Sequence, residues 1–357
     1  MNFRPIHPVL TMALCAGCVF ELPHRGGEPH LPPLLEAGVP LQGSRPAMPD
    51  DPFRFKGEVF TDLVQHTDTQ VGADMEPDLS PDGQWLAFSS TRHDLEPDIY
   101  LKAVNGHGVI RKTFHPAIDC QSAFSPDGSR IAFCSNRHGD FDIFLMSTLG
   151  REAPVSLTHG DGDEMHPTWS PDGSKIAYCA FDPRLGDWEL RVVDVATGAK
   201  TYLGINGLYP EWSPDGKRLA FQRARERGEH WYSIWTVDLA SSGSSWQVEA
   251  SNPMELVAAP SWGAITPSWS RDSRYLVFVT VNRTGASGKD RPWHGKDVWM
   301  VAKDGSSLVQ LTPPGSAVAS PTWGSDDRVY FVSDRNGQKC IWSLKPLLLE
   351  GPRPGAP

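Results

Sequence analysis

One short phrase returns six times along this chain and constrains its fold more than any other feature. A bulky apolar residue is followed by Ser, Pro, Asp and Gly and then by a short apolar strand; the last two copies are decayed. The central aspartates are Asp82, Asp127, Asp172, Asp215, Asp272 and Asp326, at intervals of 45, 45, 43, 57 and 54 residues. A propeller blade of four strands has a period of about 40–50 residues. The sequence therefore predicts an all-β fold, a six-bladed β-propeller, with insertions in the loops of its later repeats.

Each repeat also predicts a tight turn between two strands. Pro presets φ at the first loop position, Asp caps the turn, and Gly accepts the left-handed conformation that closes a short hairpin. In the third repeat, Trp169 and Ser170 end one strand, and the return strand begins at Lys175. The repeated tryptophans at the start of the phrase are expected in the core between blades, where burial of a large side chain contributes most. They are Trp169, Trp212, Trp269 and Trp323.

The sixth repeat stops after its third strand, and an unmatched strand at residues 59–66 precedes the first repeat. We predict that this N-terminal strand pairs beside residues 340–344, completes the last four-stranded blade and closes the ring. Closure removes the open sheet edges that invite aggregation. The propeller is expected to span residues 53–346, and residues 347–357 are expected to form a disordered tail.

Residues 1–18 have the features of a signal peptide. Arg4 gives a weakly positive start, and the apolar stretch from Pro8 to Gly17 is too short to cross a bilayer. Small residues before Cys18 resemble a bacterial lipobox, although Cys15 stands where Leu is usual. We expect lipidation at Cys18, with ordinary cleaved secretion as the alternative. Residues 19–52 are rich in Pro and Gly, which predicts a disordered tether.

Four further cysteines lie in the predicted propeller. Export would permit disulfides, but their connectivity cannot be deduced from one sequence. Two of them flank one predicted hairpin and could face each other, and buried free thiols in strands are the alternative. The four residues are Cys120, Cys134, Cys179 and Cys340.

The net charge of −10 is spread along the chain without long runs of one sign. Nucleic-acid binding is not expected, because neutralising phosphates requires a basic surface. A basic peptide or a cation is the more natural partner for a mildly acidic surface.

The full repeat resembles the WD40-like propeller repeat of the TolB family over residues 57–345. The motif Pro-x-Trp-Ser-Pro-Asp-Gly is followed by Ile-Ala-Phe, Ser-x-Arg and Asp-Ile-Tyr. The resemblance implies a propeller of the bacterial cell envelope, as TolB is the periplasmic component of the Tol–Pal system. TolB proteins carry an N-terminal α/β domain where this chain has the Pro-rich segment, so orthology with TolB is not expected. Related propellers precede the catalytic domain of prolyl-oligopeptidase-like enzymes, but the Gly-x-Ser-x-Gly elbow of such hydrolases is missing here.

Charged residues recur at two places in the repeat. The Ser-x-Arg arginines Arg92, Arg137 and Arg335 end the return strands, and acidic residues begin the third strands. We expect these opposite charges to pair and to fix one loop of each blade. The acidic residues are Asp98, Asp142, Glu189 and Asp297.

The residues around the start of each innermost strand are expected to ring one mouth of the central channel. In the first three repeats they are charged, and in the later repeats they are neutral or apolar. This asymmetry favours a binding site for a protein or peptide, or for Ca²⁺ through hard oxygen ligands; a merely solvated acidic rim is the alternative. The candidate residues are Asp74, Glu76, Asp119, Asp163, Glu164 and His166.

Two further features bear on function. A pectate-type lyase on a similar propeller uses channel histidines with a divalent metal, so His159 and His166 keep a channel enzyme, a lyase or hydrolase, or a carbohydrate-binding propeller open as the alternative. The polar insertion at residues 284–296 carries Trp293 and His294, which are candidate anchors for a partner. The sequence as a whole predicts a non-enzymatic protein-interaction propeller, exported to the periplasm or outer envelope, that touches a membrane only through its lipid anchor.

Overall fold

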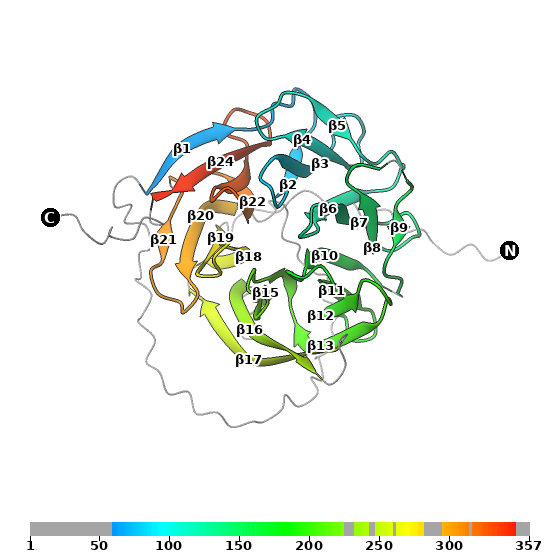
Figure 1. The fold of residues 1–357 in the computed structure, drawn as a ribbon. Helices are drawn as coiled ribbons and strands as arrows, with labels where there is room; N and C mark the ends of the chain where they lie inside the picture. Colours follow the sequence, from blue (N-terminus) through cyan, green and yellow to red (C-terminus); the bar gives the residue numbers. More distant parts are fainter. Residues whose placement is uncertain are drawn as a thin grey trace, which may run out of the picture.

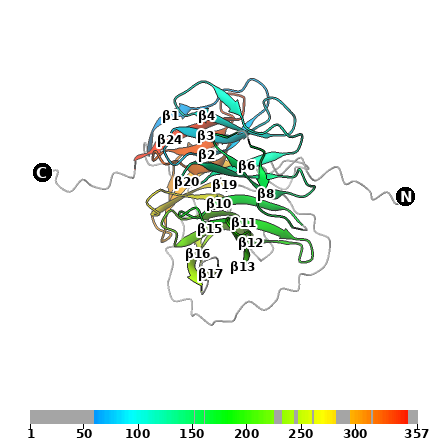
Figure 2. The same cartoon turned by 45° about the vertical axis from the view of Figure 1, so that its right-hand side comes forward.

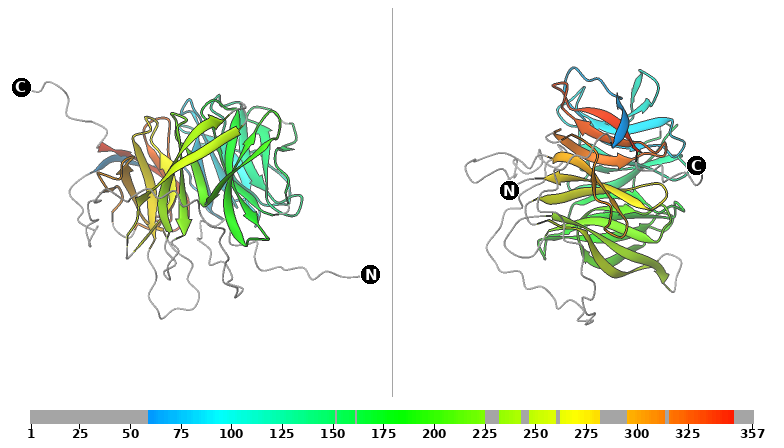
Figure 3. Two further views of the ribbon diagram at one scale, coloured as in Figure 1. Left: turned by 90° about the horizontal axis from the view of Figure 1, so that it is seen from below. Right: turned by 90° about the vertical axis from the view of Figure 1, so that its left-hand side faces the viewer.

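Six four-stranded antiparallel sheets are arranged around a central axis, as the repeat predicts (Figure 1). The structure is a computed structural model that describes residues 59–150, 152–160, 162–224, 232–242, 247–259, 262–281, 295–313 and 316–347. In five sheets the strands follow the chain from the innermost to the outermost position, and in the sixth the outermost strand comes from the N-terminal end, so each sheet is one blade of a β-propeller. Figure 2 shows the same stacking of blades from an oblique direction, and Figure 3 shows the ring from its edge.

The first three blades come directly from the three best copies of the repeat. Blade 1 contains β2 (Asp74–Leu79), β3 (Trp85–Ser90), β4 (Asp98–Ala103) and β5 (Val109–Arg111). Blade 2 contains β6 (Asp119–Phe124), β7 (Arg130–Ser135), β8 (Asp142–Ser147) and β9 (Val155–Ser156). Blade 3 contains β10 (Glu164–Trp169), β11 (Lys175–Asp182), β12 (Asp187–Asp194) and β13 (Lys200–Asn206).

The remaining blades follow the same order. Blade 4 contains β14 (Leu208–Trp212), β15 (Arg218–Ala224), β16 (Tyr232–Ser242) and β17 (Gln247–Val257). Blade 5 contains β18 (Gly263–Trp269), β19 (Tyr275–Val281), β20 (Gly295–Ala302) and β21 (Val309–Gln310). Blade 6 contains β22 (Val318–Trp323), β23 (Val329–Ser333) and β24 (Cys340–Pro346), and its fourth strand is β1 (Phe60–Gln65) from the other end of the chain.

The closure of the ring by the N-terminal strand is confirmed. β1 pairs antiparallel with β24, with Phe60 opposite Pro346 and Gln65 opposite Trp342 (Figure 1). The amide of His66 continues the contact by donating to the carbonyl of Ile341 at 2.8 Å. The two ends of the described chain therefore pair within one blade, and β24 has a neighbouring strand on both of its edges.

The turn chemistry of the repeated phrase is also as expected. In the second repeat, Ser125 Oγ donates to Asp127 Oδ1 at 2.6 Å, and the amide of Ser129 donates to the same oxygen at 3.0 Å. These hydrogen bonds lower the pKa of Asp127 to about 2. Gly128 has φ of 69°, in the left-handed region. The phrase thus builds the hairpin, and its polar atoms bond to one another within the turn.

The core lies within and between the blades. The four repeated tryptophans are 3–8% exposed, which confirms their expected place in the core. The indole Nε1 of Trp169 donates to the carbonyl of Ala123 in the preceding blade at 3.1 Å, and Trp269 makes the same bond to Glu211 at 3.2 Å. These two tryptophans therefore bond across the space between blades that they fill, whereas Trp212 Nε1 donates to the carbonyl of Gly216 in its own blade at 3.3 Å.

The four cysteines of the propeller are buried thiols that form no disulfide, which decides between the two alternatives that the sequence left open. Cys120 and Cys134 do face each other across β6 and β7. Within the described ranges, no helix has the length and apolar character needed to cross a lipid bilayer. The predicted signal peptide with Cys18, the predicted tether, and the loop residues Trp293 and His294 lie outside the described residues.

Candidate binding site in the central channel

Every innermost strand carries the same irregularity, and it decides which side chains enter the channel. The pairing register shifts once along the innermost strand in all six blades, for example between Met75 and Asp78. The shift lies between the second and fifth residues in blades 1, 2, 3 and 6, the first and fourth in blade 4, and the third and sixth in blade 5. The residue at the shift has positive φ, between 48° and 57°, although none is glycine. These six channel-turn residues are Glu76, Gln121, His166, Tyr209, Thr266 and Ser320. Such a conformation costs about 1–2 kcal/mol per residue, so it persists only where its surroundings hold it.

Side chains of the preceding blade hold these turns. The amide of Gln121 donates to Glu76 Oε2 at 2.9 Å, and the amide of His166 donates to Gln121 Oε1 at 3.0 Å. In blade 5 the amide of Thr266 donates in the same way to Gln222 Oε1 at 2.9 Å. The shift frees an amide from the strand ladder, and the neighbouring blade supplies its acceptor, as buried backbone groups require. The channel turns therefore join adjacent blades.

The prediction that the Ser-x-Arg arginines pair with the acidic residues at the start of the third strands is wrong. Arg92 Nη2 binds both carboxylate oxygens of Asp74 at 2.7 Å, and Arg137 Nη2 binds Asp119 at 2.9 and 3.0 Å. Both aspartates begin innermost strands and are 0% exposed. The last residue of the return strand has the first residue of the innermost strand on one side and the first residue of the third strand on the other, and both guanidinium groups turn to the innermost strand.

The acidic residue at the start of the third strand has other partners. In blade 1, Asp98 contacts Arg111 of β5, and Thr113 Oγ1 donates to Asp98 Oδ1 at 3.0 Å. In blade 2, Asp142 faces two histidines instead. Arg335 stacks over the rings of Phe331 and Trp342, since Val318 occupies the matching first position in blade 6.

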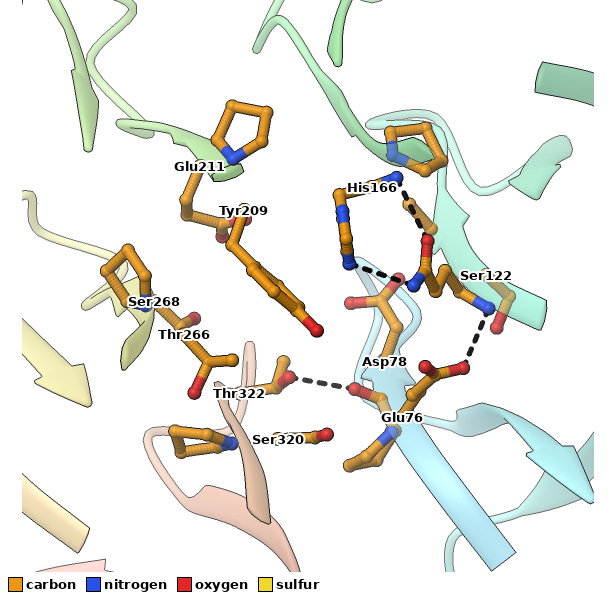
Figure 4. A pocket seen from close by; sticks show the side chains of 17 residues that line it. Glu76, Asp78, Ser122, His166, Tyr209, Glu211, Thr266, Ser268, Ser320 and Thr322 are labelled. Atoms are coloured by element: carbon orange, nitrogen blue, oxygen red, sulfur yellow. Dashed lines mark hydrogen bonds between the residues drawn. The ribbon is translucent and has the colours of Figure 1, made fainter. Parts of the chain in front are cut away.

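The channel-turn residue of each innermost strand and the one or two residues after it line a cavity of about 140 Å³ on the axis of the ring (Figure 4). At about 30 Å³ per water in the liquid, this space holds roughly five waters. Its acidic lining residues are Glu76, Asp78 and Glu211, and none of the residues that line it, all in the described part of the chain, is Lys or Arg. The cavity thus gathers negative groups without a fixed cation to neutralise them.

Burial shifts the pKa of all three carboxyl groups upward. Removal from water raises the pKa of Glu76 and of Asp78 to about 7. Burial raises the pKa of Glu211 to about 8, and the charge of Asp78 adds to that rise. Hydrogen bonds oppose the shifts: Ser89 Oγ donates to Glu76 Oε2 at 2.8 Å, and the amide of Phe124 donates to Asp78 Oδ2 at 2.7 Å. Near neutral pH the three groups are poised between their charged and uncharged forms.

Aromatic and amide groups form the other side of the cavity. His166 Nε2 lies 2.8 Å from Gln121 Nε2, and its Nδ1 lies 3.2 Å from Cys179 Sγ. Burial lowers the pKa of His166 to about 3, so its ring is neutral. The ring of Tyr209 packs against His166 with centroids 3.6 Å apart, and Figure 4 shows its hydroxyl extending into the cavity on the side of Asp78.

Of the predicted mouth residues, only Glu76 and His166 line this cavity. Asp74 and Asp119 do not line the cavity, because each carboxylate is paired with an arginine at the outer end of the innermost strand. Glu164 pairs with Lys200 at 2.8 Å, and Asp163 Oδ1 accepts from the amide of Phe141 at 3.0 Å. The expected division concerned the start of the innermost strands, where blades 4 to 6 carry Tyr209, Thr266 and Ser320; further along its innermost strand, blade 4 adds an acidic residue, Glu211.

Sequence reasoning placed Tyr209 at the mouth as an uncharged residue and missed the lining residues Asp78, Gln121 and Glu211. A signal for them exists, because the channel-turn residue always lies six positions before the repeat aspartate, and in five of the six repeats the residue four positions before it also lines the cavity. A Ca²⁺ site at the mouth stays a prediction. The carboxyl groups of the cavity are not among the described groups whose ligand atoms converge as for a metal ion.

Comparisons with known proteins agree with this architecture. Residues 58–161 match the family model of the TolB beta propeller domain. A protein designated TolB from Agrobacterium tumefaciens has a similar structure, with 22% identity, a TM-score of 0.56, and coverage of 77% of this chain and 91% of that one. The fold is a TolB-like propeller. The TolB crystal structure from Acinetobacter baumannii is similar at 22% identity and a TM-score of 0.54, over 71% of this chain and 57% of that chain.

The TolB-like propeller shares its architecture with an enzyme as well. Oligogalacturonate lyase from Vibrio parahaemolyticus is similar at 13% identity and a TM-score of 0.51, over 79% of this chain and 93% of that chain. No curated protein matches the sequence. At these identities the likeness concerns the fold, and function has to be argued from the residues of the channel.

Proposed function

We propose that this TolB-like propeller is a non-enzymatic interaction protein of the bacterial cell envelope, which binds a protein or peptide at the channel by accepting a cationic side chain. The observation that carries the proposal is the group of three partly buried carboxyls, Glu76, Asp78 and Glu211, in a cavity whose lining has no Lys or Arg. A buried charge is costly unless it is paired, so a cation entering the cavity would supply the missing partner.

The size and the electrostatics of the cavity support this choice of ligand. A space of about 140 Å³ suits one long side chain, and the rest of a partner would have to lie on the face of the ring. Because desolvation raises the carboxyl pKa values to about 7 and 8, a Lys or Arg would bind while displacing protons. Binding should therefore strengthen as the pH rises from 6 to 8.

The location of the protein belongs to the same proposal. Export to the periplasm or outer envelope, with a lipid on Cys18 and a Pro-rich tether behind it, would let the ring stand away from a membrane surface. An envelope protein with a basic segment is then a partner within reach.

A channel enzyme is the alternative, favoured by one observation: His166 shares a cavity with Glu76 and Asp78. Its ring nitrogens are engaged by Gln121 and Cys179, which leaves no free nitrogen to act as a base. The test is incubation with oligogalacturonate while following formation of the unsaturated product. Activity that His166→Ala removes would establish the enzyme and overturn the binding proposal.

Site-specific photo-cross-linking in cells tests the binding proposal. A photoreactive residue replaces Ser320 at the channel turn of blade 6, and the matched control carries it at Tyr202, which is 60% exposed on the outermost strand of blade 3. We expect Ser320 to capture an envelope protein at a segment that contains Lys or Arg, and to lose it when Glu76→Gln, Asp78→Asn and Glu211→Gln are combined. Equal capture from Tyr202, or capture that survives the triple variant, would contradict the proposal.

A further inference from the structure

A second group of ligand-type side chains lies outside the channel, in blade 2. His138 Nδ1 is 3.9 Å and His159 Nδ1 is 3.6 Å from the same carboxylate oxygen, Asp142 Oδ2. The three ligand atoms all lie within 4.8 Å of one another. His138 precedes β8, Asp142 begins it, and His159 follows β9, so two segments, the start of β8 and the loop after β9, converge at this point.

The internal repeat shows what is unusual about this group. The equivalent carboxylate in blade 1 is Asp98, and it is compensated by the guanidinium of Arg111 on β5. Arg111 lies opposite Tyr100, and Ser156 lies opposite the matching Phe144 in blade 2, so Ser156 stands in the place of that arginine. Asp142 is as buried as Asp98, with 3% and 2% of each residue exposed. Blade 2 therefore keeps the buried carboxylate, loses its cation, and places two imidazoles around it.

We propose that His138, Asp142 and His159 form a binding site for a divalent transition-metal ion of the zinc class. Two imidazoles and one carboxylate are the donor set that such ions prefer, and Ca²⁺ or Mg²⁺ would prefer oxygen ligands alone. Tetrahedral ligands about 2.1 Å from Zn²⁺ stand about 3.4 Å apart, close to the 3.6 and 3.9 Å observed. The imidazoles are half and four-fifths exposed, so small side-chain rotations close the remaining gap.

The surroundings prepare this site for a cation. Lys200 Nζ bonds the carbonyl of His159 at 3.1 Å and Glu164 Oε1 at 2.8 Å, which fixes the segment that carries the histidine. The amide of Glu164 donates to the carbonyl of Phe141, the residue before Asp142, at 2.6 Å. With neutral histidines, Asp142, Glu164 and Lys200 leave one net negative charge there. The ring of His138 packs on Phe144 with centroids 5.3 Å apart, which limits its orientations.

Three protein ligands leave one or more coordination positions open to water or to a donor from another molecule, as in zinc sites that exchange ligands. The site is independent of the proposed function in the channel, because none of its residues lines the cavity. A failure of one would leave the other standing.

The test is Zn²⁺ binding by the full chain, measured by competition with a chromophoric chelator after metal has been stripped. His138→Asn and His159→Asn should each weaken the site more than about 10-fold, since even outer partners of a metal site contribute 10–100-fold. Ser156→Arg should remove it as well, by giving Asp142 the guanidinium that Asp98 has in blade 1. His93→Asn is the matched control, because His93 follows Arg92 in blade 1 as His138 follows Arg137 in blade 2.

The expected result is one equivalent of Zn²⁺ lost in the three blade 2 variants and kept in His93→Asn. Thermal unfolding of each variant without metal confirms that it folds. Zn²⁺ binding that is the same in the wild type and in all four variants would overturn the proposal, since any binding then belongs to other cysteines or histidines. Equal loss in His93→Asn would overturn it too.

Discussion

Replacement of Glu211 by Gln should stabilise the propeller at alkaline pH and have little effect in acid. In the folded chain, burial raises the pKa of Glu211 to about 8 from the ordinary value of 4.5, which applies to the unfolded chain. Between these two pH values the folded protein holds a proton that the unfolded chain has released. Because the folded state binds more protons, stability falls as the pH rises through this window.

The size of the effect follows from the same values. At about 1.4 kcal/mol per pH unit, a rise from 4.5 to about 8 corresponds to an upper limit of roughly 5 kcal/mol. The hydrogen bonds from the hydroxyls of Thr168 and Ser268 lower the pKa and are already contained in the value of about 8. Relaxation of the protein and water in the cavity reduce the penalty below this limit. We therefore expect Glu211→Gln to raise the free energy of unfolding by about 1–3 kcal/mol at pH 9 and by less than about 0.5 kcal/mol at pH 4.

Urea unfolding followed by tryptophan fluorescence at pH 4, 6, 8 and 9 measures this. Glu152→Gln is the control, because Glu152 is exposed and its charge is solvated in both states. The wild type and the control should lose stability together as the pH rises, and Glu211→Gln should lose less. Parallel curves for all three proteins would show that Glu211 is ionised at no cost, and the reasoning about the cavity would be wrong.

Three further outcomes are expected. Arg137→Gln should destabilise the fold by roughly 3–5 kcal/mol, since it leaves Asp119 buried and unpaired. Arg335→Gln should cost much less in the same urea titration, because Arg335 has no acid at the matching position. Equal losses would contradict the pairing of Arg137 with Asp119. Removal of residues 1–66, which deletes β1, should lower the melting temperature and promote association through the bare edge of β24, whereas removal of residues 1–58 should do neither. Calorimetry measures the melting temperature and sedimentation measures the association. Identical behaviour of the two truncations would refute ring closure as the stabilising contact. Iodoacetamide should leave Cys134 and Cys179 unmodified in the native protein and label both after unfolding, because burial raises their thiol pKa values. Rapid labelling of the native protein would show that the core opens around these two cysteines.

The ring itself was predictable because its information is local and repeated. Ser125, Asp127 and Gly128 form a turn whose hydrogen bonds lie within five residues, and the spacing of such turns sets the blade length. The missing strand of blade 6 followed from counting, since the ring had three strands at one end of the chain and one at the other.

The direction of side chains around the channel was not predictable in the same way. Regular alternation would place Asp74, Glu76 and Asp78 on one face of β2, but the register shift after Met75 sends Asp74 to Arg92 and the other two into the cavity. The shift depends on the acceptor that the preceding blade offers, so it is a property of the assembled ring. The constant offset from the repeat aspartate was present in the sequence, and reading it would have identified Tyr209 and Glu211.

The group around Asp142 illustrates a second limit. Its histidines are separated by 21 positions in the sequence and converge only because β7, β8 and β9 pair in register. His159 attracted notice beside His166, yet the fold places them in different sites. Comparison of blade 2 with blade 1, strand by strand, was needed to see that an arginine had been lost.

The central claim, that the channel carboxyls accept a cation from a partner, is tested most directly by calorimetry with the peptide acetyl-Ser-Gly-Lys-Gly-Ser-amide at pH 7 in buffers of different ionisation enthalpy. Binding of the lysine peptide is expected to release protons and to be absent with norleucine in place of lysine. It should also be lost in the combined Glu76→Gln, Asp78→Asn and Glu211→Gln variant. Binding that is equal for the norleucine peptide, or that the triple variant retains without proton release, would contradict it.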